Sequence, residues 1–331
     1  MTLQLTNSRA SLVAAIRKFL PPLSVPLYKG RIAVVGGSED YTGAPYFAGY
    51  SALRVGADLC HIFCERNAGT VIKTYSPELI VHPYLLTTDH ITSDYETIIS
   101  KIVSRVTSVF PRLHVVLVGP GLSRDDAMMQ CATRVIKAAK DLNMPLVIDA
   151  DGLFLIQNDP SIISGYPYAV LTPNANEFAR LCEVMKVNNV EPDQQVMKLS
   201  QALGNVTIVQ KGEVDRISNG VDVLTCDAEG APRRCGGQGD LLSGAIAAFL
   251  GFGKAYASNA WRHSNELNGD TFLSRSLPLL AAYGACLLVR ACAKEAYKKR
   301  GRAMMASDMI EEVGRQFAHE FDSPIDSPLK L

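Results

Sequence analysis

Short apolar runs, mostly β-branched, alternate with longer helical stretches along the first two-thirds of this chain. Runs such as Val115–Val118 and Leu146–Ile148 show no alternation of polar and apolar residues, which is typical of strands buried on both faces. The other runs are Arg31–Val35, Leu59–Phe63, Ala169–Leu171 and Val206–Val209. Because helical stretches separate them, we expect an α/β fold with a mostly parallel sheet covered by helices on both faces.

The expected helices in this part are Ala44–Val55, Asp125–Leu142 and Asn176–Met185. The pattern then changes, because Asp215–Ser218 and Val221–Cys226 flank Asn219-Gly220, a signal for a hairpin with a two-residue turn. Three further helices are expected at Asp240–Leu250, Leu277–Tyr297 and Ala306–Glu320, with a polar surface insertion at Ser264–Ser276. No repeat or linker divides the chain, so we predict a single domain over residues 1–331, with 1–28 as an N-terminal helical extension.

The 33 basic residues balance the 33 acidic ones. A protein that binds nucleic acid through its phosphates usually has a basic excess, so no nucleic-acid partner is expected. No uninterrupted apolar run reaches the roughly 18–20 residues that span a bilayer, so no membrane association is expected.

The eight cysteines are scattered along the chain at positions 60, 64, 131, 182, 226, 235, 286 and 292. This spacing favours buried thiols in a reducing compartment over a disulfide framework or a zinc site. We therefore expect a cytoplasmic protein. The acid-free N-terminus leaves mitochondrial targeting open, although Ser11–Leu20 is better explained as a surface helix that ends at Pro21-Pro22.

The junction Gly236-Gly237-Gln238-Gly239-Asp240 precedes a helical stretch. Glycines let backbone amides approach an anion, and the start of a helix adds unpaired N–H groups and a positive dipole end. Asp240 would repel an anion there, unless it accepts a proton from a nucleophile that attacks a phosphoryl group. The alternative role for Asp240 is a simple N-cap. Neither a P-loop motif nor a Gly-x-Gly-x-x-Gly after the first strand is present.

Six segments in one order carry a resemblance to a known family. They are Lys29–Ser38, Val118–Leu122, Ile148–Leu153, Leu171–Phe178, Gln210–Glu213 and Arg234–Asp240. Together they resemble the ATP-dependent NAD(P)H-hydrate dehydratases, which are nicotinamide-nucleotide repair enzymes of the ribokinase-like superfamily. The resemblance implies a ribokinase-like three-layer fold. It also implies ATP-dependent dehydration of (6S)-NADHX and (6S)-NADPHX, in which phosphorylation of the 6-hydroxyl is followed by elimination of phosphate.

The resemblance implies that Asp240 is the catalytic base and that Gly237 and Gly239 bind the transferred phosphoryl group. Gly121 and Asp240 would contact the hydrated nucleotide, together with Asn174, Ala175, Asn176, Glu177, Phe178, Ala179 and Arg180. Glu177 would also organise Mg²⁺, directly or through water. The same Asn-x-x-Glu element is, however, expected to form a helix capping box.

The ATP site implied by the resemblance has two parts. The first is Lys211, Gly212, Glu213, Val214 and Asp215, and the second is Gly230, Ala231, Pro232, Arg233, Arg234, Cys235, Gly236, Gly237, Gln238 and Gly239. Lys211-Gly212 taken alone would equally suit a plain turn.

Three further features are left with open roles. Gly36-Gly37-Ser38 would form a second wall of the substrate pocket. Asp149 and Asp151 either support magnesium or form a polar turn. Ser123 stands where the family usually has glycine, which affects the fine shape of the pocket.

The implied partners are the substrates NADHX, NADPHX and ATP, with a separate NAD(P)HX epimerase, and a homo-oligomer is left open. Two rival functions are a ribokinase-like kinase of a vitamin precursor or sugar, and a nucleotide-binding regulatory protein without catalysis.

Overall fold

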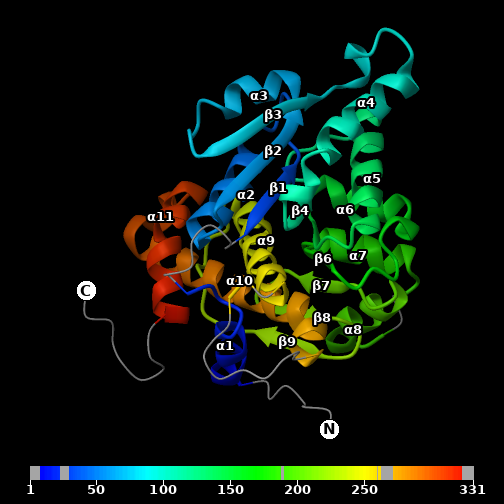
Figure 1. Ribbon diagram of the computed structural model, residues 1–331. Helices are drawn as coiled ribbons and strands as arrows, with labels where there is room; N and C mark the ends of the chain where they lie inside the picture. The colour runs from blue at the N-terminus through cyan, green and yellow to red at the C-terminus, as the bar shows by residue number, and fades with distance from the viewer. Residues whose placement is uncertain (1–7, 23–29, 188–189, 259, 262–270, 323–331) are drawn as a thin grey trace.

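The computed structural model describes residues 8–22, 30–187, 190–258, 260–261 and 271–322. Its strands form one sheet (Figure 1). They are β1 (Arg31–Val35), β2 (Leu59–Glu65), β3 (Leu79–Leu85), β4 (Val115–Val118), β5 (Leu146–Ile148), β6 (Ala169–Leu171), β7 (Thr207–Gln210), β8 (Asp215–Ser218) and β9 (Val223–Cys226). Their order is β3-β2-β1-β4-β5-β6-β7-β8-β9, and all neighbouring strands are parallel except the pairs β7–β8 and β8–β9, which are antiparallel.

Helices cover both faces of the sheet, as the apolar runs predict (Figure 1). One face carries α1 (Arg9–Arg17), α2 (Gly43–Val55), α3 (Arg66–Ile72), α9 (Gln238–Ala257), α10 (Thr271–Arg300) and α11 (Ala306–Phe317). The other carries α4 (Tyr95–Thr107), α5 (Asp126–Asp141), α6 (Asp151–Asn158), α7 (Ala175–Val184) and α8 (Pro192–Ala202). Short helical turns lie at Thr88–His90, Phe110–Arg112, Pro160–Ile162, Gly301–Ala303 and Ala318–Asp322. The two faces have separate hydrophobic cores, and Val34 and Val35 point to opposite ones.

The strand order reverses between β1 and β4, which are neighbours in space. In open α/β sheets such a reversal leaves a crevice at the carboxyl ends of the strands, where ligands bind. Gly36 follows β1 and lies so close to the loop after β4 that a Cβ on it would stand 2.1 Å from the carbonyl oxygen of Pro120. Only glycine fits there, and the crevice opens at this edge.

Three local predictions were wrong or incomplete. Strand β3 and helices α3, α4, α6 and α8 were not predicted; β3 contains Pro83, which is tolerated because β3 is an edge strand. The hairpin joining β8 and β9 forms as expected, but Ser218 pairs with Val223, so its connection has four residues rather than two. Of the predicted insertion Ser264–Ser276, residues 264–270 lie outside the described residues, and the rest belongs to α10.

Helix α10 corrects the expectation about apolar length. The helical span Ser276–Ala303, which covers most of α10 and the turn after it, contains an 18-residue window with a mean hydropathy of 1.6, long and apolar enough to cross a membrane. However, 83% of that window is buried inside the fold. It is the packing of a core helix that requires this composition. Helix α1 also belongs to the core, because Leu12, Val13 and Ile16 are buried on the same face as α10. This agrees with the interpretation of Ser11–Leu20 as a helix of the fold; residues 1–7 and 23–29 lie outside the described residues.

Candidate active site

Three polar residues stand one position beyond three neighbouring parallel strands. Asp149 follows β5, Thr172 follows β6 and Lys211 follows β7. The Lys211 Nζ lies 3.1 Å from Asp149 Oδ1, and the Thr172 hydroxyl donates to the same oxygen at 2.8 Å. The Asp149 side chain is 3% exposed and that of Lys211 is 20% exposed. The strand ends therefore deliver a nearly buried ion pair to the edge where the crevice opens.

The predicted phosphoryl-binding junction begins α9 beside this ion pair. Gly237 is the N-cap with φ of 87°, and Asp240 is the third residue of the helix. The alternative role of Asp240 as the N-cap is therefore wrong, and its carboxylate is not used to cap α9. A Cβ on Gly237 would stand 2.8 Å from Ala306 of α11 and 3.0 Å from Phe47 of α2. Packing from two helices thus requires glycine at this turn.

The electrostatics of the junction suit a base. Burial and, to a smaller extent, the nearby charge of Asp149 raise the pKa of Asp240 to about 8, although Lys211 acts in the opposite direction. Burial alone would lower the pKa of Lys211, but the charges of Asp149 and Glu177 outweigh it and the net pKa is raised. Lys211 stays a cation, whereas Asp240 has a pKa close to that of an efficient general base at neutral pH.

Gly239 connects the junction to the ion pair. A Cβ on Gly239 would stand 3.4 Å from Lys211 Nζ. The first turn of α9 and the ammonium group therefore face the same small space. An anion bound there would meet unpaired backbone N–H groups, the positive end of α9 and the Lys211 charge together.

The Asn174–Glu177 element forms the predicted capping box at the start of α7. Asn174 Oδ1 accepts from the backbone N–H groups of Asn176 and Glu177, each at 3.0 Å. Glu177 Oε2 accepts from the Asn174 N–H at 2.7 Å. Burial raises the pKa of Glu177. Because one carboxylate oxygen carries this bond, the other is free of the capping box, and the element can serve both as a cap and as a ligand.

The remaining residues predicted around α7 differ in what they expose. Ala175, Asn176, Ala179 and Arg180 are exposed. The Phe178 side chain is buried in the core, so only its backbone could face a substrate.

The predicted glycine-rich wall forms beside Gly121. The Gly37 N–H donates to the Gly121 carbonyl at 3.1 Å, and a Cβ on Gly121 would stand 2.5 Å from the Tyr41 carbonyl oxygen. Ser123 has a φ of 70°, a left-handed conformation that favours glycine. The Asp151 carboxylate accepts from the Ser123 N–H at 3.0 Å. Asp151 thus supports this loop.

Sequence reasoning missed Arg290 of α10, which joins the two predicted parts of the ATP site. Its Nε lies 2.7 Å from Asp215 Oδ2, and its other nitrogens donate to the carbonyls of Gly212 at 3.0 Å and Ala228 at 3.1 Å. Asp215 also accepts from the Gly212 N–H at 3.0 Å. The Asp215 carboxylate therefore shapes the loop instead of facing a nucleotide. No local motif marks an arginine 75 positions away.

The second part of the predicted ATP site runs from this clamp to α9. Gly230 lies against the Arg290 side chain, and Arg233 donates to the Met304 carbonyl at 3.2 Å. The Cys235 Sγ lies 3.9 Å from Met309 Sδ, whereas Glu213, Pro232, Arg234 and Gly236 are exposed and Val214, Ala231 and Gln238 are half-buried. All eight cysteines are free, as expected, and all but Cys235 are buried.

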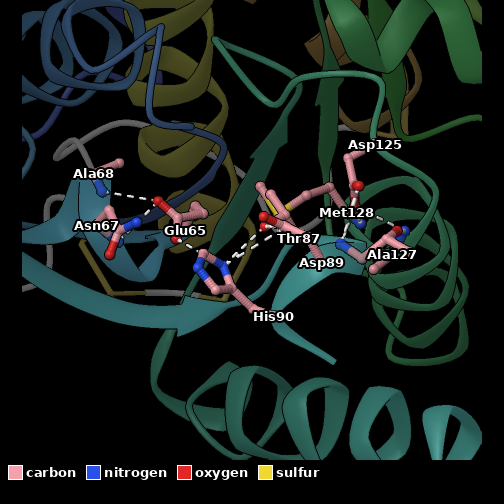
Figure 2. A network of polar contacts seen from close by, with 10 residues as sticks. Glu65, Asn67, Ala68, Thr87, Asp89, His90, Asp125, Ala127 and Met128 are labelled. Carbon is pink, nitrogen blue, oxygen red and sulfur yellow. Dashed lines mark hydrogen bonds and ion pairs between the residues drawn. The ribbon is translucent and has the colours of Figure 1, made fainter. Parts of the chain in front are cut away.

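A second polar network, also unpredicted, lies at the ends of β2 and β3 (Figure 2). Glu65 Oε2 accepts from the N–H groups of Asn67 and Ala68 at 2.8 and 2.9 Å and so caps α3. His90 Nδ1 lies 3.9 Å from Glu65 Oε1 and 2.9 Å from the Thr87 hydroxyl. These contacts fix the loop that follows β3. The Glu65 N–H also donates to the Gly37 carbonyl at 3.0 Å, which supports the glycine-rich wall from outside.

Comparison with known proteins identifies the family. Residues 32–315 match the family model of NAD(P)H-hydrate dehydratase. The ATP-dependent (S)-NAD(P)H-hydrate dehydratase of Homo sapiens is 48% identical over 315 residues, which cover 93% of this chain and 84% of that protein. The enzyme of the same name from Ciona intestinalis is 44% identical over 332 residues, covering 98% and 85%. This chain belongs to the NAD(P)H-hydrate dehydratase family.

A solved structure of an NAD(P)H-hydrate dehydratase shares the fold. The ADP/ATP-dependent enzyme from Bacillus subtilis, co-crystallised with ATP and Mg²⁺ and soaked with CoA, superposes with a TM-score of 0.60 at 21% identity, covering 94% of this chain and 97% of that one. A ribokinase-like superfamily protein from Enterococcus faecalis superposes with a TM-score of 0.69 at 19% identity, covering 98% of this chain and 100% of that one. The ribokinase-like fold inferred from the six ordered segments is thereby confirmed. The Lys211–Asp149 pair and the start of α9 are, in this chain, the groups that the family's fold brings together at the carboxyl edge of the sheet.

Proposed function

We propose that this chain uses ATP to dehydrate the (6S) hydrates of NADH and NADPH at the junction that begins α9. The observation that carries the proposal is the position of Asp240. Asp240 lies in the first turn of α9, close to the positively charged Lys211, and has a pKa of about 8. A base and an anion site in one turn are what phosphorylation of a hydroxyl requires.

The chemistry has two steps. Asp240 takes the proton of the 6-hydroxyl while the hydroxyl oxygen attacks the γ-phosphorus of ATP. The new O–P bond forms, the bond between the γ-phosphorus and the oxygen of the β-phosphate breaks, and ADP leaves. The amides of Gly237 and Gly239 would receive the transferred phosphoryl group. The ring nitrogen lone pair then expels phosphate from C6, and loss of a proton from C5 restores the double bond. Phosphate is a far better leaving group than hydroxide, which is why ATP is needed.

Magnesium fits the residues present. Among the described residues, no three His, Cys, Asp or Glu side chains converge as a metal site. Mg²⁺ commonly binds with one or two carboxylates, several waters and the phosphates of its nucleotide. Glu177, whose second oxygen is not used by the capping box, would supply the protein contact. The ion would neutralise charge on the phosphates.

The same proposal extends to the partners. The stereospecific names of the relatives, which specify the S form, support a separate epimerase that converts the other epimer. The cytoplasm is proposed as the location, supported by eight free cysteines.

The test is incubation of the protein with hydrated NADH, ATP and Mg²⁺ while the absorbance of reduced nicotinamide is followed. We expect the absorbance to return only when all components are present. One ADP and one phosphate should form for each NADH molecule that is regenerated. A stable phosphorylated product without returning absorbance would instead identify a kinase that stops after the first step. ATP binding without any turnover would identify a regulatory protein.

A further inference from the structure

Asp149, Thr172 and Lys211 form a chain of contacts across three strand ends. The strands β5, β6 and β7 are adjacent and parallel, and neighbouring strands lie about 4.8 Å apart. Lys211 therefore reaches past the end of β6 to meet Asp149 at the end of β5. The Thr172 hydroxyl lies on the strand between them, fully buried, and bonds to the same oxygen that receives Lys211.

The ammonium group is left with donors to spare. It has three N–H bonds, and within the described residues its one hydrogen bond goes to Asp149. The Nζ atom lies 3.4 Å from where a Cβ on Gly239 would stand, beside the turn where the transferred phosphoryl group is proposed to bind. A compact, strongly charged ammonium group is suited to such a group, because charge-assisted bonds to phosphate are about twice as strong as neutral ones.

We propose that Asp149, locked by Thr172, is a positioning residue that holds the Lys211 ammonium against the phosphoryl group during transfer. This inference rests on the proposed function. Lys211 would touch the phosphoryl oxygens, whereas Asp149 would act only through Lys211. The two aspartates at the cluster then have separate tasks: Asp240 takes the proton, and Asp149 places the cation. The sequence left Asp149 between a magnesium role and a polar turn. Its carbonyl accepts from the Gly152 N–H at 2.9 Å, as in a turn, and its carboxylate is the group that meets Lys211.

The experiment is a double-mutant cycle with Asp149→Asn and Lys211→Met, assayed with hydrated NADH, ATP and Mg²⁺. Asparagine keeps the shape of Asp149 and removes its charge. We expect Asp149→Asn to lower kcat about tenfold to a hundredfold, the size of one charge-assisted bond, with little change in KM for hydrated NADH. Because Asp149 acts through Lys211, the double variant should be no slower than Lys211→Met alone.

Additive losses in the double variant would overturn the inference. So would a normal kcat for Asp149→Asn accompanied by a higher Mg²⁺ requirement, which would make Asp149 a metal-site residue. If the wild type shows no turnover at all, the proposed function fails first, and the two failures are therefore distinguished.

Thr172 supplies a second pair of variants in case Asp149→Asn does not fold. Thr172→Val keeps the size of the side chain and removes the hydroxyl that orients Asp149, and Thr172→Ser keeps the hydroxyl. We expect a several-fold loss of kcat in Thr172→Val, from one lost hydrogen bond, and recovery of most of it in Thr172→Ser. Equal losses in both variants would show a packing role and overturn the inference.

Discussion

The segment Lys211–Asp215 carries an ion pair at each end, and the two pairs differ in how completely they are satisfied. Arg290 meets Asp215 and two backbone carbonyls, and Asp215 also accepts a backbone N–H. At the other end, Lys211 interacts electrostatically with three carboxylates, those of Asp149, Glu177 and Asp240. Its hydrogen bond goes to Asp149.

This difference indicates different tasks. A buried pair in which both side chains are also bonded to the backbone around them fixes the shape of a loop. At the Lys211 end, one cation faces three carboxylates. Burial, together with the charge of Asp149, raises the pKa of Asp240 there. Perturbed groups of this kind concentrate where chemistry occurs. The comparison predicts that damage to one end reduces stability and damage to the other reduces turnover.

The largest expected effect is that of Asp240→Asn. General-base catalysis contributes roughly a hundredfold to ten-thousandfold, so turnover of hydrated NADH should fall by that factor. The midpoint of thermal unfolding should be maintained or rise, because a partly buried carboxylate that is costly to ionise is removed. A variant with wild-type kcat would mean that Asp240 is not the base.

Replacement of Arg290 tests the other end. Arg290→Met leaves Asp215 buried without its cation, and breaking such a pair costs about 3–5 kcal/mol. Urea unfolding should show this loss. In the double variant Asp215→Leu with Arg290→Met most of it should return, since no charge is left unpaired. If Arg290→Met instead lowered kcat at unchanged stability, the proposed division between the two ends would be wrong.

The pH dependence of stability and of activity provides a second test of the Lys211 end, because Asp240 lies there. The pKa of Asp240 is raised from 3.8 to about 8, so the native state holds a proton that the unfolded chain releases. Stability from this group is therefore full below pH 4 and is lost as pH rises to about 8. Activity should move oppositely and level off above pH 8, when the base is free. Chemical unfolding across this range should show the slope in the wild type, and Asp240→Asn should lack it.

The smallest effect is expected at Asn174. This residue combines a structural and a functional role, because it caps α7 and belongs to the same capping box as Glu177, which lies near Lys211 and Asp149. Asn174→Ala should cost about 1 kcal/mol of stability through the lost cap. Asn174→Ser can still cap α7, so it should recover the stability. If the amide also serves the Mg²⁺–ATP complex, KM for ATP should stay raised in the serine variant. Full recovery of both quantities would reduce Asn174 to a cap.

Much of this site could be predicted from the sequence, because its parts are local. The apolar runs determined the strands β1, β4, β5 and β6, and the polar residues after them had to meet at one edge of a parallel sheet. The glycines before α9 indicated an anion site, and Asn174 and Glu177 signalled their capping box. These features depend on backbone preferences and short spacings, which a sequence displays directly.

Only the tertiary structure decided how these parts are used. That Lys211 crosses to Asp149, 62 positions earlier, and that Arg290 binds Asp215, 75 positions earlier, depends on which strands and helices become neighbours. The shift in the pKa of Asp240 depends in the same way on burial and on a charge from another strand end. The sequence by itself determined which chemical groups stand at the edge of the sheet. Their charges act through space, so their roles followed only from the distances that folding created.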